Sequence, residues 1–156
     1  MANDSKRRRQ HKGRGSEHSF LGIPHYILRS PEFGRLTGWD VKLLIEFGGN
    51  YRGKNNGDLS AAFSVLKTRG WNSAGTLNAT IQRLVRDGWI IHTRQGSRNR
   101  CALFALTWWP LDECPGKWLE ISAEVTARHS WKTDSVVAMR TNVVAMRCSQ
   151  GSGAAS

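Results

Sequence analysis

One short segment of the sequence carries side chains that match the hydrogen-bonding edges of DNA bases. Residues 72–89 read NSAGTLNATIQRLVRDGW, and the spacing predicts an amphipathic helix over about 73–87. Its expected apolar stripe is Ala74, Leu77, Ile81, Leu84 and Val85. Its candidate base-reading residues are Ser73, Thr76, Asn78, Ala79, Gln82 and Arg83.

These residue types fit the chemistry of base recognition in the major groove. Asn and Gln can each form two hydrogen bonds with adenine, Arg pairs with guanine, and a Thr methyl can touch the methyl of thymine. A solvated helix face with no ligand would carry the same residue types, so the helix alone leaves both interpretations open. The flanking elements therefore decide between them.

Two helices are expected before this segment. Residues 37–40, TGWD, have the spacing of a capping box with Asp in place of Glu or Gln, which predicts a helix over about 38–48. Gly48 and Gly49 favour a left-handed exit from it. Asp58 or Ser60 can cap a second helix that ends near residues 69–70.

A β-hairpin is expected after the segment. Asn72 or Ser73 can cap the helix of 73–87, and Gly88 ends it. Residues 89–94 then read as a strand, 95–100 as a turn, and 101–109 as the returning strand before Pro110. The expected order is helix, short break, helix and basic-tipped hairpin.

The charge of the chain favours a polyanionic partner. The net charge is +11, from 23 Lys and Arg against 12 Asp and Glu. Between residues 58 and 109 there are seven basic residues and two acids. The candidate contacts to the DNA backbone are Lys67, Arg69, Arg86, Arg94, Arg98, Asn99 and Arg100. No run of about 18 apolar residues is present, so we expect nucleic acid rather than a membrane as the partner.

Residues 57–114, GDLSAAFSVLKTRGWNSAGTLNATIQRLVRDGWIIHTRQGSRNRCALFALTWWPLDEC, resemble the winged helix-turn-helix proteins of phages, plasmids and integrated mobile elements. The upstream segment from Phe20 is similar to their lead-in, so the resemblance covers about residues 20–118. It implies an α+β fold of about three helices and a β-hairpin wing. Many of these proteins have no assigned role, and related wings serve repressors, replication initiators and partition proteins.

Three regions are expected along the chain. Residues 1–19 are basic and almost free of apolar side chains, which predicts a disordered arm. Residues 20–121 are expected to form the winged helix-turn-helix domain. Residues 122–156 are expected to be a flexible tail, in which VVAMR occurs twice, at 136–140 and 143–147.

The expected function is sequence-specific binding of duplex DNA, as a cytoplasmic transcriptional regulator of a mobile element. The recognition helix of about 73–87 would enter the major groove, and the wing of 94–100 would follow the backbone or minor groove. A plasmid or phage replication-initiation or accessory protein that binds origin repeats is the alternative. A homodimer is expected because a single small DNA-binding module buries little surface on DNA. The candidates for a surface beyond the core are Trp108, Trp109, Trp118 and Trp131.

Two other classes are less well supported by the residues. A nicking enzyme could use Tyr26 or Tyr51 as its nucleophile, but the chain has no His-apolar-His triplet to hold a metal. RNA binding would favour exposed stacking aromatics, whereas most Trp residues occupy positions expected in the core. Cys101, Cys114 and Cys148 are widely spaced and are expected to be reduced thiols. We therefore expect no catalytic residue, no metal and no cofactor.

Overall fold

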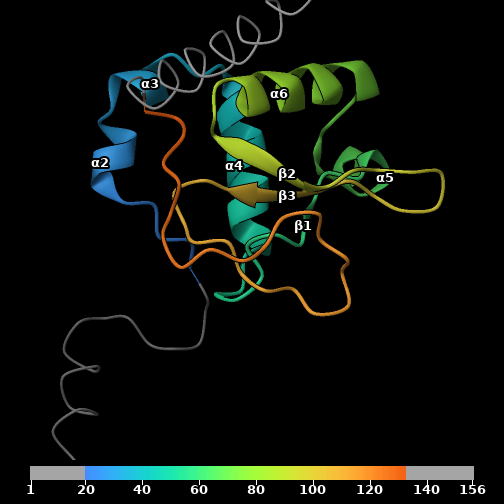
Figure 1. The fold of residues 1–156 in the computed structure, drawn as a ribbon. Coiled ribbons are helices and arrows are strands. Elements are labelled where there is room, and N and C mark those ends of the chain that lie inside the picture. The colour runs from blue at the N-terminus through green and yellow to red at the C-terminus, as the bar shows by residue number, and fades with distance from the viewer. Residues whose placement is uncertain (1–19, 133–156) are drawn as a thin grey trace, which may run out of the picture.

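The computed structural model describes residues 20–132, which form a mixed α and β structure (Figure 1). The helices are α2 (His25–Leu28), α3 (Pro31–Gly34), α4 (Gly38–Asn50), α5 (Phe63–Leu66), the 3-10 helix η1 (Lys67–Arg69) and α6 (Ala74–Arg86). The strands are β1 (Leu59–Ser60), β2 (Ile90–Arg94) and β3 (Leu103–Leu106). The α+β class expected from the sequence is confirmed. The predicted basic arm and the VVAMR repeat lie outside the described residues.

Helix α4 begins at the predicted capping box. The Asp40 backbone N–H donates to the Thr37 hydroxyl at 3.3 Å, and the Thr37 backbone N–H donates to the Asp40 carboxylate at 2.9 Å. The predicted left-handed exit at Gly48 is wrong, because α4 continues to Asn50 and Tyr51 follows it in extended geometry. Gly48 instead allows the Leu21 side chain to pack closely against α4, since a Cβ at this position would lie 2.6 Å from that side chain.

The predicted second helix is shorter and starts later than expected. Leu59 and Ser60 form strand β1, so the predicted caps at Asp58 and Ser60 are wrong. Leu59 pairs with Phe104 and is fully buried. This pairing gives backbone N–H and C=O groups on one edge of β3 their hydrogen-bond partners, which a helix beginning at Ser60 would not provide. Helix α5 then begins at Phe63 without a side-chain cap, and the following 3-10 turn ends at Gly70, whose φ is +86°.

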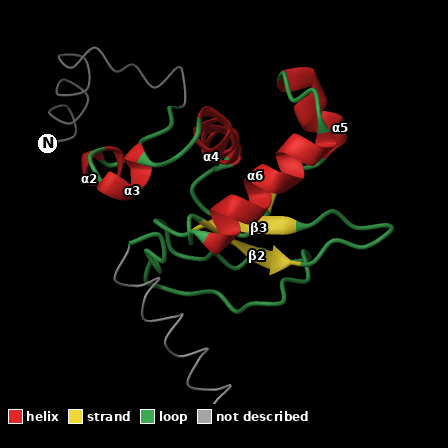
Figure 2. Cartoon of the chain, turned by 90° about the horizontal axis from the view of Figure 1, so that it is seen from above, coloured by secondary structure: helices red, strands yellow, loops and turns green. Residues whose placement is uncertain are grey.

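The sheet is antiparallel with strand order β1-β3-β2. In the β2–β3 ladder, Ile90 pairs with Leu106 and His92 pairs with Phe104, and the register shifts between His92 and Arg94. The hairpin beyond this shift projects from the body on the side where α6 begins (Figures 1 and 2). Helices α2 and α3 lie at the opposite end of the molecule (Figures 1 and 2).

The core joins α4, the sheet and the segment after β3. The Phe47 and Phe104 rings pack at 5.5 Å between centroids, and Trp89 stacks on Trp131 at 4.8 Å. Gly88, with φ of +78°, lies against the Ser130 carbonyl, where a Cβ would come within 2.4 Å. Ser130 and Trp131 are buried although the domain was expected to end at 121, so the packed part of the chain extends at least to Trp131.

The tryptophans expected to supply a surface beyond the core separate into two groups. Trp108 and Trp131 are buried, and Trp109 stacks on Tyr51 at 4.1 Å. Trp118 is 75% exposed. Of these four residues, only Trp118 therefore offers a large apolar surface to solvent.

Candidate functional site

Helix α6 presents a continuous outer face of small and amide residues. Its cap is Ser73, whose hydroxyl accepts a hydrogen bond from the Thr76 backbone N–H at 3.3 Å. Leu77, Thr80 and Leu84 are buried, and Ile81 and Val85 are partly buried against the core. The exposed residues of the helix are Ala74, Gly75, Asn78, Ala79, Gln82 and Arg86.

The apolar stripe predicted for this helix is correct except at two positions. Ala74 is exposed because it lies in the first turn, outside the contact between α6 and the core. Thr80 is fully buried, although it was not predicted in the stripe. Its hydroxyl accepts a hydrogen bond from Arg83 at 3.2 Å, which satisfies a polar group on the buried side.

Asn78 and Gln82 lie one helical turn apart above an open groove of about 360 Å³ between α6 and the hairpin. Ile81 lines the groove with them, and its other lining residues are Ala61, Ala62, His92, Cys101, Ala102 and Phe104. Neither amide side chain has a hydrogen-bond partner within residues 20–132. Both are therefore free to bind an outside group.

Arg83 has a different environment from the other candidate base readers. Its Nε and Nη2 donate to Asp40 Oδ1 at 3.1 and 2.9 Å, and the Asp40 side chain is only 5% exposed. Burial alone would raise the pKa of the Asp40 carboxyl, but hydrogen bonds from Thr37 and Arg83 and the guanidinium charge hold that pKa below its ordinary value. Arg83 thus joins α6 to the first turn of α4.

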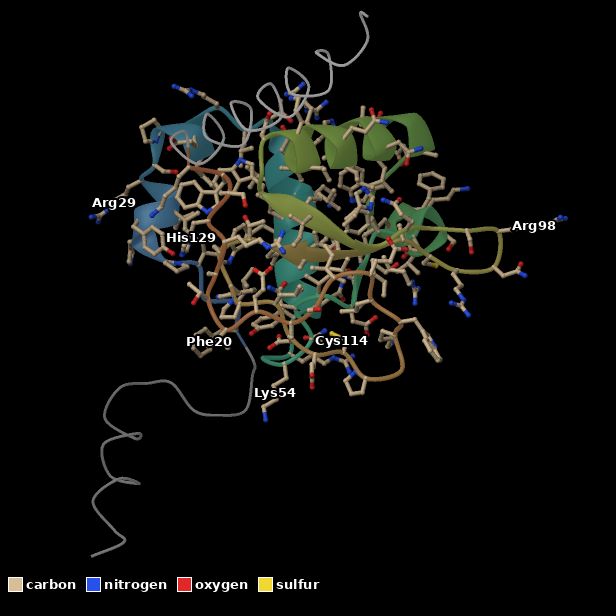
Figure 3. All side chains as sticks on the ribbon, in the orientation of Figure 1. Phe20, Arg29, Lys54, Arg98, Cys114 and His129 are labelled. Carbon is tan, nitrogen blue, oxygen red and sulfur yellow. The ribbon has the colours of Figure 1, made fainter. Side chains whose placement is uncertain are left out.

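The arginines of the hairpin differ in whether the protein itself binds their side chains. Arg94 donates to the Lys117 carbonyl at 2.7 Å and to the Cys101 carbonyl at 2.8 Å, so it holds the hairpin base to the following segment. Ser97 and Arg100 close the tip through reciprocal backbone hydrogen bonds of 2.8 and 3.2 Å. Arg98 points away from the body (Figure 3). The side chains of Arg98, Asn99 and Arg100 are exposed and have no partner in the described part of the chain.

The other basic residues proposed to contact the DNA backbone also differ in whether an acidic side chain pairs with them. Arg69 donates to Glu46 at 2.7 Å, and Arg86 pairs with Asp87 at 2.8 Å. Lys67 is exposed and forms no ion pair among residues 20–132. The basic side chains that the structure leaves unpaired among the seven candidates are therefore Lys67, Arg98 and Arg100.

Asn56 supports the site and was not found from the sequence. It is fully buried, and its Nδ2 donates to the carbonyls of Leu106 and Pro110 at 2.9 and 2.7 Å and to that of Trp109 at 3.2 Å. Its Oδ1 accepts from the Leu106 backbone N–H at 2.8 Å. Asn56 therefore anchors the C-terminal end of β3, which lies opposite the hairpin turn. The sequence offers little signal for it, since KNNGD is also an ordinary polar turn.

The residues considered for catalysis do not form a cluster with metal ligands. Tyr51 donates to the Gly53 carbonyl at 3.0 Å, and its pKa is raised by burial and by the charge of Asp112. Tyr26 is half-exposed beside His129 and Trp131. Within residues 20–132, no group of three or more His, Cys, Asp or Glu side chains is arranged to hold a metal. In the same range, every helix is too short or too polar to cross a bilayer.

Comparison of the chain with known protein families, with curated proteins and with solved structures gave no match.

Proposed function

We propose that this protein binds duplex DNA, with α6 in the major groove and the hairpin on the adjacent backbone or minor groove. The observation that carries the proposal is the pair of unpartnered amides, Asn78 and Gln82, exposed one turn apart on α6. No acidic residue occurs from 72 to 86, so no carboxylate on this helix would repel phosphate.

The order of elements supports the same geometry. Helix α4, strand β1, the short α5, helix α6 and the β2–β3 hairpin follow one another as in a winged helix, with α6 in the place of the recognition helix. The major groove is about 12 Å wide and admits an α-helix. Gly75 and Ala79 on the exposed face are small enough to let the helix backbone approach the base edges.

The distribution of unpaired charge supports a division of labour. Arg98 and Arg100 lie at the hairpin tip, and Lys67 lies shortly before α6. Contacts from such residues to phosphate set affinity and register, whereas contacts to base edges set sequence preference. We propose that the hairpin supplies the contacts to phosphate and α6 the contacts to base edges.

The biological role proposed is regulation of transcription on a mobile element, with origin binding as its alternative. A selected site that overlaps the promoter of the protein's own gene would support the regulator. Repeats of the site within a replication origin would support the alternative.

The test is selection of binding sites from a random duplex pool at about 150 mM salt, where non-specific binding is suppressed. We expect one motif to be enriched by the full chain and lost with the variant Asn78→Ala/Gln82→Ala. Enrichment that survives in this variant would contradict the role of α6.

A matched pair of charge variants tests the hairpin. Arg98→Ala/Arg100→Ala should weaken binding to all duplexes, because it removes two phosphate contacts. Arg29→Ala/Arg35→Ala removes the same charge from exposed positions directly after α2 and α3, the helices at the opposite end of the molecule from the hairpin, and should leave binding nearly unchanged. Equal losses from the two variants would mean that net charge alone attracts DNA, and would overturn the proposal.

A further inference from the structure

Resting on the proposed function, we infer that α6 selects adenine–thymine base pairs and does not read guanine. The inference comes from which side chains of α6 are free and which are held by the protein. It names the class of target that this surface recognises.

Among the exposed residues of α6, the hydrogen-bonding side chains without a partner in residues 20–132 are both amides. Asn78 and Gln82 project from one face, and their donors and acceptors have no partner within residues 20–132. An amide offers one donor and one acceptor side by side, which matches N7 and the N6 amino group of adenine. Ala79 lies exposed beside Asn78, and its methyl can contact the C5-methyl of the paired thymine.

The groups that would read guanine are engaged elsewhere. A guanidinium or ammonium group is needed to donate to both O6 and N7 of guanine. Helix α6 has two such residues: Arg83 is bound to Asp40, and Arg86, in the last position of the helix, bonds both oxygens of Asp87 at 2.8 and 3.2 Å. Release of Arg83 would leave the buried Asp40 carboxylate without its counter-charge, which opposes its use on DNA.

Cytosine also lacks its preferred partner on this surface. Its N4 amino group is read by carboxylates, and residues 72–86 contain no Asp or Glu. The helix therefore presents free groups suited to A·T pairs, whereas its two guanidinium groups are paired with carboxylates and it has no carboxylate of its own for cytosine.

The experiment uses the full chain and duplexes that carry the motif selected above. Replacement of the contacted adenine by 7-deazaadenine removes N7 and hence one of two hydrogen bonds, so affinity should fall by roughly 3- to 10-fold. The corresponding change of a guanine to 7-deazaguanine should have no effect. Asn78→Ala or Gln82→Ala should lower affinity for the motif by roughly 5- to 150-fold, the range for a bidentate pair, and abolish the response to 7-deazaadenine at one position.

A gain of specificity gives an independent test, since both amides are exposed and their replacement leaves the core intact. Gln82→Arg places a free guanidinium on the reading face and should change the selected base from adenine to guanine at one position. Circular dichroism of each variant checks that the fold is retained.

The outcomes separate the inference from the proposed function. A selected motif that is rich in G·C, or one whose binding ignores 7-deazaadenine, would overturn the inference while hairpin-dependent duplex binding still stood. Absence of any enriched motif, together with no effect of Arg98→Ala/Arg100→Ala, would overturn the proposed function itself.

Discussion

Arg83 is expected to position α6, so Arg83→Ala should lower stability before it alters base preference. The change removes two hydrogen bonds to Asp40 Oδ1, one to Thr80 Oγ1 and a longer one of 3.5 Å to Thr37 Oγ1. A hydrogen bond to a charged group contributes about 1.5–3 kcal/mol, and breaking a fully buried ion pair costs about 3–5 kcal/mol. Arg83 is 35% exposed and Asp40 keeps its bonds from Thr37, so solvent screening reduces the expected loss to about 1–3 kcal/mol.

The assay is urea unfolding of the full chain, followed by tryptophan fluorescence. We expect the midpoint to fall with little change in the slope, which indicates lost stability rather than a changed unfolded state. Arg86→Ala is the matched control, because its ion pair with Asp87 lies at the surface and should change stability by less than about 0.5 kcal/mol.

The difference between wild type and Arg83→Ala should depend on pH in a defined direction. The pKa of Asp40 is lowered in the folded protein, so the carboxylate stabilises the fold at pH above its unfolded value of about 3.9. This contribution is lost as the pH falls through the lower folded pKa, and the two proteins should converge there. Full stability of Arg83→Ala with a relaxed preference at one base pair would show that Arg83 reads DNA, and would refute the positioning role.

Three further predictions concern Asn56, the partly buried His92 and the hairpin arginines. Asn56→Ala should lower the free energy of unfolding in urea by about 2–5 kcal/mol, since four side-chain hydrogen bonds are lost and the buried Leu106 N–H is left without an acceptor. An equally stable variant would contradict the anchoring role of Asn56. Burial lowers the pKa of His92, so its contribution to stability is complete above a pH of about 6.5 and decreases as the pH falls below that value. His92→Phe should therefore reduce the dependence of the unfolding free energy on pH, measured by urea unfolding at pH 5.5 and 7.5. Arg98→Ala/Arg100→Ala should reduce the slope of log affinity against log salt by about 1.8, and an unchanged slope would exclude phosphate contacts by both residues.

The sequence by itself determined the local elements whose signals lie within a few residues of one another. The capping box of Thr37 and Asp40, the Ser73 cap and the spacing of Leu77 and Leu84 all act within one or two turns. Such patterns specify where helices begin and which face is apolar, because the interacting groups are brought together by the helix itself. The exposed amides of α6 were predicted for the same reason.

Only the tertiary structure decided which polar residues remain free. Arg83 and Asp40 are 43 residues apart and meet because α6 packs across the first turn of α4. Likewise, Leu59 becomes a strand because β3, far along the chain, offers an unpaired edge. A helical pattern shows which residues share a face, but the neighbouring element determines which of them find a partner. For this protein, that difference separates Arg83 from Asn78 and Gln82.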